Sequence, residues 1–267
     1  MSAMPKVVED VPVLLEELED GVLRLTMNRP TARNALSVAL MAAMIDALDR
    51  AGRDGAVRVV VIAGAGPAFC AGHDLREIRG DRRREVYERL FAQCSDLMLK
   101  IVRLPKPVIA EVHGVATAAG CQLVASCDLA VAAKDARFAT PGVNIGLFCS
   151  TPMVALSRAI GRKAAMEMLL TGDLVDASAA QRLGLVNRVV PAGELRGACD
   201  ALARQIAGKS ALTLAIGKDG FYRQLELGLD SAYAYVSEIM TRNLLAYDAG
   251  EGIDAFFEKR QPSWQDR

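Results

Sequence analysis

The feature that most constrains the fold is a short apolar run at 57–63 that leads directly into a glycine-rich loop at 64–73. The run, VRVVVIA, is mostly apolar and rich in β-branched residues. Such a run, without polar alternation, is typical of a strand that is buried on both faces, as in a sheet covered by helices. The sequence therefore predicts an α/β fold.

Other elements follow before residue 150. Two apolar-rich runs at 13–18 and 22–27 flank an Asp-Gly turn and predict a β-hairpin. Ser37 is a good N-cap for a helix with apolar residues at 40, 41, 44, 45 and 48, and glycines at 52 and 55 are expected to end that helix. We then expect a long helix, a strand, a short helix and a strand, at 81–103, 108–112, 119–126 and 129–133.

The second half of the chain is predicted to be mostly helical. One short strand is expected at 185–190, and helices are expected at 151–160, 162–171, 177–183, 194–207, 210–224, 228–247 and 251–258. No low-complexity segment or sharp linker interrupts the sequence. We therefore expect an α/β core over 1–200 and a helical C-terminal region over 201–267.

Composition excludes several classes of protein. Lys plus Arg and Asp plus Glu each number 32, and aromatic residues make up 5%, so a general nucleic-acid binder is not expected. No apolar run reaches the ~18 residues of a membrane span. The acidic N-terminus lacks the basic start of a targeting peptide, which predicts a cytoplasmic protein. The six cysteines form no CxxC pair and fit no zinc site, so we expect reduced thiols and no metal.

Common catalytic and phosphate-binding motifs are absent. The loop after 57–63 fails the dinucleotide fingerprint because Phe69 stands where its third glycine would be. There is no GxxxxGK[ST], HExxH or GxSxG motif. The two histidines are His73 and His113, and a Cys149–His113 nucleophile pair stays open although no spacing supports it.

Six segments occur in a characteristic order along the chain. They are Asn28-Arg29-Pro30 with Asn34-Ala35-Leu36, VVVIAGAGPAFCAGHDL at 59–75, PKPVIAEVHGVATAAGCQL at 105–123, CDLAVAAKDARFATP at 127–141, LLTGDLVDASAAQRLGLVNRVVP at 169–191 and EGIDAFFEKRQP at 251–262. Together they resemble the crotonase family, that is, enoyl-CoA hydratases and isomerases, over about residues 12 to 264. The resemblance implies a spiral of ββα repeats whose C-terminal helices support trimers, often paired into hexamers. It also implies an acyl-CoA ligand, with CoA as part of the substrate and no separate cofactor.

The resemblance implies an oxyanion hole made by two backbone N–H groups. By position, the donors are the N–H groups of His73 and Ala119. Such donors lower the barrier to enolate formation because charge develops on the thioester oxygen. Ala118-Ala119-Gly120 is expected to open a helix whose positive end favours that charge.

The same resemblance suggests residues that contact CoA. They are Arg33, Ala71, His73, Asp74, Leu75, Arg76 and Lys259, with Arg260 as a further phosphate partner. For the charged residues, a surface role without ligand is an equal alternative. The His73 side chain is either solvated or close to the CoA phosphates, and Arg82-Arg83-Arg84 is interpreted as a solvated helix start.

The chain departs from the family where the two catalytic glutamates normally stand. One position is Gln122 and the other is Gly142. An amide does not exchange protons near pH 7, and glycine has no side chain. Losing a positioned acid or base costs ~10²–10⁴-fold in rate, so efficient hydration of a 2-enoyl-CoA is not expected. Phe148 is expected to change the shape of the pocket.

No substitute acid or base is singled out by the sequence. The carboxylates that remain open are Glu77, Asp81, Glu85 and Glu111, and the other polar candidates are Thr117, Thr140, Asn144, Cys149 and Ser150. The first hypothesis is an enzyme of lyase or isomerase type that acts on an acyl-CoA. The second is a protein that binds an acyl-CoA without turnover. The third is a structural oligomer whose acyl site is filled by bulky side chains such as Phe148.

Overall fold

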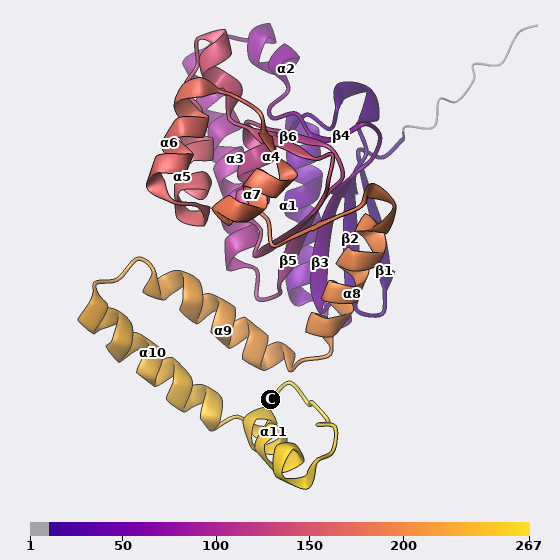
Figure 1. The fold of residues 1–267 in the computed structure, drawn as a ribbon, viewed down its shortest axis with the longest axis vertical. Coiled ribbons are helices and arrows are strands. Elements are labelled where there is room, and N and C mark those ends of the chain that lie inside the picture. Colours follow the sequence, from indigo (N-terminus) through magenta and orange to yellow (C-terminus); the bar gives the residue numbers. More distant parts are fainter. Residues whose placement is uncertain (1–10) are drawn as a thin grey trace, which may run out of the picture.

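The computed structural model describes residues 11–267. The expectation about a targeting peptide concerns the first residues of the chain, and residues 1–10 lie outside the described part. An α/β core carries three C-terminal helices, which extend away from it in Figure 1. Within the described part, no helix is both long enough and apolar enough to cross a membrane.

The chain enters the core through the predicted hairpin. Strands β1 (Leu14–Glu19) and β2 (Val22–Met27) pair antiparallel across Asp20-Gly21. Asp20 and Gly21 have φ values of 49° and 77°, the left-handed conformation that suits a tight hairpin turn. Helix α1 (Val38–Arg53) follows, and the Oγ of Ser37 accepts a 3.1 Å hydrogen bond from the N–H of Leu40, which confirms the predicted cap. The helix continues through Gly52 before it ends.

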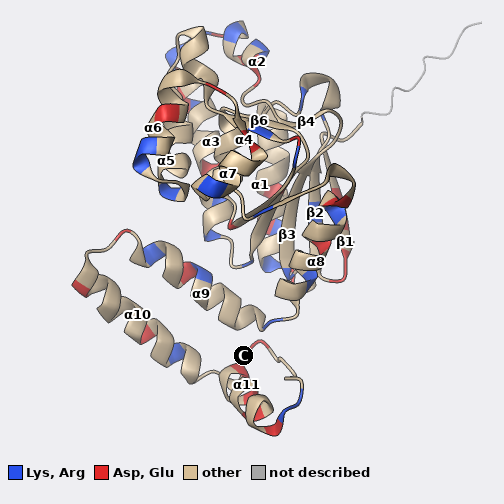
Figure 2. Ribbon diagram, in the orientation of Figure 1, with Lys and Arg blue, Asp and Glu red and all other residues tan. Residues whose placement is uncertain are grey.

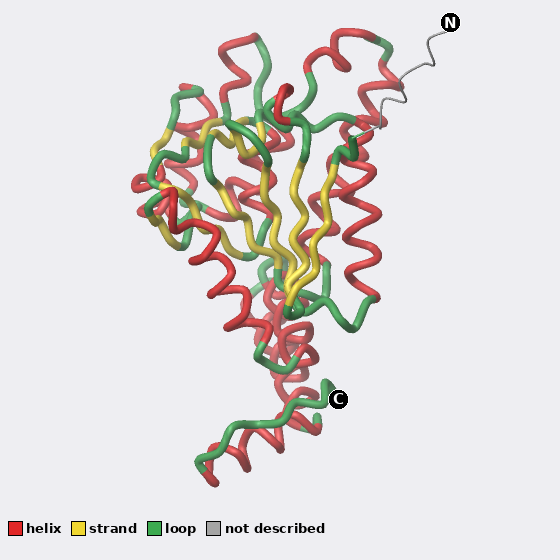
Figure 3. Tube along the Cα trace, turned by 90° about the vertical axis from the view of Figure 1, so that its right-hand side faces the viewer, coloured by secondary structure: helices red, strands yellow, loops and turns green. Residues whose placement is uncertain are grey.

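The remaining strands form two sheets. They are β3 (Val59–Gly64), β4 (Ala68–Cys70), β5 (Val108–Val112), β6 (Val115–Thr117), β7 (Leu129–Ala133), β8 (Arg137–Ala139), β9 (Val175–Asp176) and β10 (Arg188–Val190). The larger sheet has the order β1-β2-β3-β5-β7-β10 and the smaller one β4-β6-β8-β9. Each of the pairs β3–β4, β5–β6 and β7–β8 gives one strand to each sheet before the chain turns into a helix, which is the expected spiral of ββα repeats (Figure 3).

The helices that follow α1 are α2 (Leu75–Gly80), α3 (Arg84–Arg103), α4 (Ala119–Ser126), α5 (Ser150–Ala159), α6 (Arg162–Thr171), α7 (Ala177–Leu183), α8 (Leu195–Ala207), α9 (Ala211–Gln224), α10 (Leu229–Leu244) and α11 (Tyr247–Glu258). Helices α1 and α3 cover one face of the larger sheet, and α8 covers the other. Val60 and Ile62 of β3 pack with α1 and α3, whereas Val59 and Val61 pack against α8. This confirms that the run at 57–63 is buried on both faces.

The structure corrects the expected elements in three places. The loop expected at 64–73 contains β4, and β6 lies between the strand expected at 108–112 and the helix expected at 119–126. Strands of three residues are too short to show a periodic pattern. The helix expected at 81–103 begins at Arg84, and the separate helix α2 precedes it. Leu202 and Ala203 of α8 are buried against the sheet, so the expected boundary at residue 200 lies too early and the core ends with α8.

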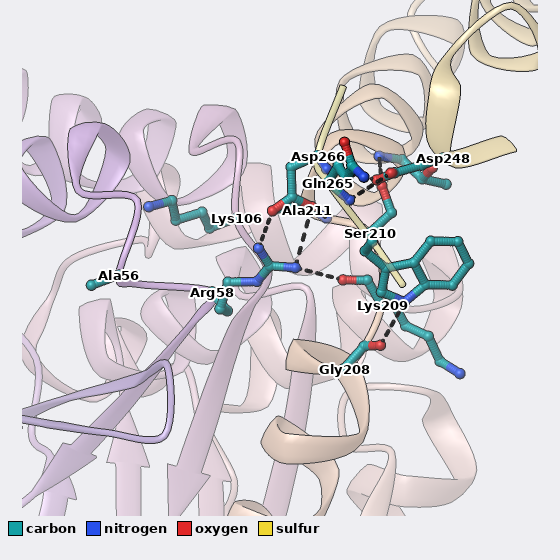
Figure 4. A network of polar contacts seen from close by, with 12 residues as sticks. Ala56, Arg58, Lys106, Gly208, Lys209, Ser210, Ala211, Asp248, Gln265 and Asp266 are labelled. Carbon is teal, nitrogen blue, oxygen red and sulfur yellow. Dashed lines mark hydrogen bonds and ion pairs between the residues drawn. The ribbon is translucent and has the colours of Figure 1, made fainter. Parts of the chain in front are cut away.

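A polar network ties the C-terminal region to the core. Arg58, at the start of β3, forms an ion pair with Asp266 and donates a 2.8 Å hydrogen bond to the carbonyl of Lys209 (Figure 4). The Nε1–H of Trp264 donates to the carbonyl of Gly208 at 2.9 Å. The C-terminal tail thereby folds back over the segment between α8 and α9 and holds the start of α9 against the core.

Candidate functional site

The loops that follow β4 and β6 meet at Gly72. A Cβ atom on Gly72 would lie 3.0 Å from the Cβ of Ala118 and 3.1 Å from the carbonyl oxygen of Thr117. Gly72 also has a φ of 95°, which favours glycine. This close approach brings the next residue of each loop, His73 and Ala119, to the same edge of the smaller sheet.

The N–H groups of His73 and Ala119 are left without a backbone acceptor within residues 11–267. On either side of His73, the carbonyl of Gly72 accepts from the N–H of Leu36 at 2.7 Å, and the N–H of Asp74 donates to the carbonyl of Leu36 at 3.1 Å. Ala119 is the first residue of α4, and no side chain caps that helix. Both expected oxyanion donors are therefore available for a ligand.

Gly120 fixes the start of α4 against β4. A Cβ atom on Gly120 would lie 2.1 Å from the carbonyl oxygen of Cys70. Only glycine allows this contact, which holds the Ala119 amide and the positive end of the helix at the edge of the sheet.

Gln122, the fourth residue of α4, is buried one helical turn from Ala119. Its Oε1 lies 4.0 Å from the Sγ of Cys94 on α3. Gln122 also lines a cavity of about 1130 Å³ between α3, α4, α5 and α9. The apolar lining comprises Met98, Leu99, Val102, Leu104, Pro105, Ala125, Val154, Ala155 and Ala215.

Gly142 lies in a 3₁₀ turn, Pro141–Ile145, at the end of β8. The nearest atoms to a Cβ on Gly142 would be the carbonyl oxygen of Leu147 at 2.7 Å and the Sγ of Cys149 at 2.9 Å. The following loop therefore occupies the space that a side chain would need. Burial raises the pKa of Cys149, so the thiol stays protonated at neutral pH.

The His73 side chain is enclosed. Both ring nitrogens are buried without a hydrogen-bond partner, a condition shared in the described chain by the hydroxyl of Thr140. The ring makes an edge-on contact with Phe91 of α3, with centroids 5.7 Å apart. Burial lowers the pKa of His73, and the nearby Leu36 carbonyl opposes this shift without cancelling it. The expectation of a solvated side chain is therefore wrong.

Most residues expected to contact CoA lie beside His73. Asp74 caps α2 and forms a 2.9 Å ion pair with Arg29. Burial alone would raise the pKa of Asp74, but the hydrogen bonds that it accepts from Arg29 and from the N–H of Arg76 lower that pKa. Leu75 and Arg76 are exposed on α2, where Figure 2 shows basic segments at the top of the molecule. The carbonyl of Arg33 accepts a hydrogen bond from the N–H of Ala71 at 3.0 Å, so Arg33 lies next to the residues that precede His73.

Lys259 and Arg260 are not brought to this place within one chain. They follow α11, which lies at the opposite end of the molecule from α2 (Figure 1). Arg260 forms ion pairs with Glu251 and Glu258 at 2.6 Å.

The other expected acids are committed elsewhere. Glu77 accepts a 2.9 Å hydrogen bond from the N–H of Val38, and Arg83 lowers the pKa of Asp81 to about 2. Glu111 forms a buried ion pair with Arg24 on the α8 side of the sheet, and Glu85 is exposed in the first turn of α3.

The remaining polar candidates add no free base. The ring of His113 bonds to the carbonyl of Gly66 at 2.9 Å, whereas Cys149 lies against Gly142. These contacts give no support to a Cys149–His113 pair. Asn144 lies against Gly172, Thr117 ends β6 and Ser150 begins α5. Across residues 11–267, no group of three or more His, Cys, Asp or Glu side chains is arranged to hold a metal ion.

Sequence reasoning missed a polar cluster at the base of the cavity. The Nζ of Lys218 on α9 donates to Asp128 at 2.7 Å and to the carbonyls of Ile101 and Lys106 at 2.9 Å each. The hydroxyl of Tyr222 donates to the same carboxylate at 2.9 Å. The spacing of four places Lys218 and Tyr222 on one face of the predicted helix, but nothing in the sequence pairs them with Asp128.

Fold and site together define a ββα spiral protein with two amides that have no backbone acceptor, an arrangement suited to a ligand's carbonyl oxygen. One turn along α4 from the second amide, Gln122 lines the large cavity. The chain belongs to the enoyl-CoA hydratase/isomerase family, whose model matches residues 17–267.

Two relatives share almost the whole fold. An enoyl-CoA hydratase from Mycobacterium smegmatis of known structure is 56% identical, with a TM-score of 0.93 over 95% of this chain and 99% of that chain. Human enoyl-CoA hydratase domain-containing protein 3 is 45% identical over 92% of this chain and 81% of the human sequence. Its crystal structure gives a TM-score of 0.92 over 94% of this chain and 100% of that chain.

Proposed function

We propose that this protein binds an acyl-CoA thioester with the carbonyl oxygen on the N–H groups of His73 and Ala119, and stabilises the enolate formed there. The observation that carries the proposal is the pair of amides without backbone acceptors. They lie at the edge of the smaller sheet, and Gln122, one turn along α4, opens onto the cavity of about 1130 Å³. Amides that are already oriented stabilise developing negative charge without reorganisation.

The cavity suits the acyl group, because most of its lining is apolar. Arg33 is bonded to Ala71, and Asp74, Leu75 and Arg76 begin α2 directly after His73; these residues are proposed to contact CoA. Lys259 would have to come from another copy of the chain, since α11 lies far from α2 (Figure 1).

Hydration by the usual pair of carboxylates is not part of this proposal. Gln122 does not exchange protons, and Gly142 leaves no room for a side chain. We favour an enzyme of isomerase or slow lyase type. The second candidate is binding without turnover. It is favoured by the two cavity-lining carboxylates, since Asp219 and Glu226 are each held in ion pairs with arginines.

The proposed assembly is a homotrimer or a hexamer. The proposed location is the cytoplasm, and the proposed role belongs to fatty-acid metabolism. Large apolar side chains are exposed along the C-terminal helices, including Phe221, Leu229, Tyr233, Met240, Leu245, Phe256 and Phe257. Such a surface suits contact with further copies. The similar rat and human proteins, enoyl-CoA hydratase domain-containing protein 3, are named as mitochondrial. The third hypothesis, a blocked pocket, gains no support because Phe148 is 42% exposed and does not line the cavity.

The test is calorimetric binding of dodecanoyl-CoA, together with the enoyl absorbance of crotonyl-CoA. Ala155→Trp fills the cavity from α5 and is expected to weaken binding at least tenfold, whereas Ser157→Trp, on the exposed face of the same helix, is the matched control. Crotonyl-CoA hydration is expected at least ~10²-fold below that of a two-carboxylate hydratase. Equal binding by both tryptophan variants would contradict the assignment of the acyl site, and fast hydration would reveal an unrecognised acid or base.

A further inference from the structure

We propose that the imidazole of His73 is the proton carrier of this site, and that the reaction it supports is proton transfer at the α-carbon of an acyl-CoA. The inference rests on the proposed function, because it requires the thioester oxygen on the amides of His73 and Ala119. It goes beyond that function by assigning a side chain and a reaction type.

The His73 ring is attached to the residue that supplies one oxyanion donor. A thioester oxygen held by that N–H would therefore bring the acyl-CoA next to the residue that carries the ring. The ring touches Phe91 on α3. One turn further along α3, Cys94 lies 4.0 Å from the Oε1 of Gln122, and Ser95 and Met98 line the cavity. Helix α3 therefore contacts the His73 ring through Phe91 and lines the acyl cavity through Ser95 and Met98.

Both ring nitrogens of His73 are without a hydrogen-bond partner. Buried polar atoms are nearly always hydrogen-bonded, because desolvation without a partner is unfavourable. His73 keeps two such atoms buried without a partner. Phe91 covers the ring and is 40% exposed, so its side chain has room to turn when an acyl chain enters. A ligand at the amides would then meet a ring nitrogen with no competing hydrogen bond.

The charge state of the His73 ring also suits a proton carrier. Neighbouring charges are already compensated, since Asp74 pairs with Arg29 and Glu77 accepts from the N–H of Val38. Arg33 is exposed on its loop, and Arg84 and Glu88 of α3 pair with each other at 2.7 Å. The Cys94 thiol is neutral, because burial raises its pKa to about 12. Burial also lowers the pKa of His73, so the imidazole is the free base at pH 7.

The reaction step balances without a further reactant. A ring nitrogen takes the α-proton, the C–H electron pair forms the enolate double bond, and the carbonyl pair moves onto the oxygen held by the two amides. The imidazolium exchanges its N–H protons with solvent and then returns a proton to the α-carbon, so in D₂O the α-carbon takes up deuterium. With a 3-enoyl-CoA it returns the proton to the γ-carbon, which moves the double bond to the 2,3-position. Hydration would in addition need a group that activates water, and the Gln122 amide does not transfer protons.

The experiment follows deuterium uptake at the α-carbon of butyryl-CoA in D₂O with the full-length protein, by mass spectrometry. His73→Phe keeps the backbone N–H and the contact with Phe91 but removes the base. It is expected to slow exchange ~10²–10⁴-fold while calorimetric binding of butyryl-CoA changes less than threefold. His113→Gln is the matched control, because a glutamine amide can still donate to the Gly66 carbonyl, and its exchange rate is expected to equal that of the unmodified protein.

A pH profile separates a proton carrier from a structural role. The exchange rate is expected to be flat above pH ~6.5 and to fall at lower pH, as His73 becomes protonated. The NMR signal of the His73 ring, identified by its persistence in His113→Gln, is expected to shift when butyryl-CoA binds, and this measurement does not depend on the folding of His73→Phe. Binding without exchange, equal exchange in His73→Phe, or an unmoved ring signal would overturn the inference. Absence of binding would instead overturn the proposed function.

Discussion

A Cβ atom on Gly142 would lie 2.7 Å from the carbonyl oxygen of Leu147, well inside the ordinary contact distance. The N–H of Leu147 in turn donates to the carbonyl of Gly142 at 2.9 Å, so the loop is closed by backbone contacts at both residues. The space in which the second family glutamate would project is therefore filled by main chain.

Gly142→Glu is consequently expected not to restore hydration. The added side chain must displace the 142–149 loop, which should lower the free energy of unfolding by about 1–3 kcal/mol, as overpacking does. Urea denaturation measures the loss, and the enoyl absorbance of crotonyl-CoA measures activity. Gln122→Glu is the control for the change in packing, because it adds a carboxyl group in a side chain of nearly the same shape. A gain in hydration from Gly142→Glu alone would show that the loop opens readily.

Gly120→Ala in α4 is expected to destabilise the protein far more than Gly197→Ala in α8. The new methyl group would lie 2.1 Å from the Cys70 carbonyl oxygen, so α4 must move away from β4. We expect a loss of more than about 3 kcal/mol in unfolding free energy. Gly197→Ala in α8 has no neighbour within 4 Å and should stabilise the protein by about 0.5–1 kcal/mol. Thermal or urea denaturation of the two variants that gave similar midpoints would contradict the packing of α4 on β4.

The sequence was informative wherever a pattern is long enough to repeat. The apolar run at 57–63, the Asp20-Gly21 turn and the Ser37 cap each depend on local physical chemistry, and the structure confirms all three. The strands β4, β6 and β8 have three residues each and were missed, because so short a segment shows no periodicity. Their pairing comes from the spiral, which is a long-range arrangement.

In the candidate site, too, the sequence predicts local features but not long-range contacts. The positions of His73, Ala119, Gln122 and Gly142 could be read from ordered motifs. The crowding at Gly142 could not, because Leu147 and Cys149 approach it only through the fold of the loop. The enclosure of the His73 ring depends on Phe91, which lies on a separate helix.

Lys218→Met tests how α9 is held against the core. Lys218 is the buried partner of Asp128, and its removal leaves that carboxylate without its ammonium partner. Breaking a buried ion pair costs about 3–5 kcal/mol, so denaturation midpoints should fall and the cavity wall formed by α9 should loosen. Dodecanoyl-CoA affinity is therefore expected to fall as well. Arg223→Ala removes an exposed pair with Asp219 on the same helix and should cost less than about 1 kcal/mol. Equal losses would show that Lys218 is not the anchor.

Asp266→Asn tests the attachment of the C-terminal tail through its pH dependence. Partial burial would raise the pKa of Asp266, but Arg58 and the Ala211 N–H outweigh burial and lower it below the ordinary value of 3.8. A carboxyl whose pKa is lower in the folded state stabilises the protein fully above its unfolded pKa, and this contribution disappears as the pH falls through the folded pKa. The difference in unfolding free energy between the unmodified protein and Asp266→Asn should therefore be constant from pH 5 to 7 and shrink below about pH 3.8. Asparagine tolerates the φ of 57° at residue 266, so backbone strain does not contribute to the difference between Asp266→Asn and the unmodified protein. Urea titrations at several pH values provide the measurement, and a difference that grows towards acid pH would contradict the ion pair between Arg58 and Asp266.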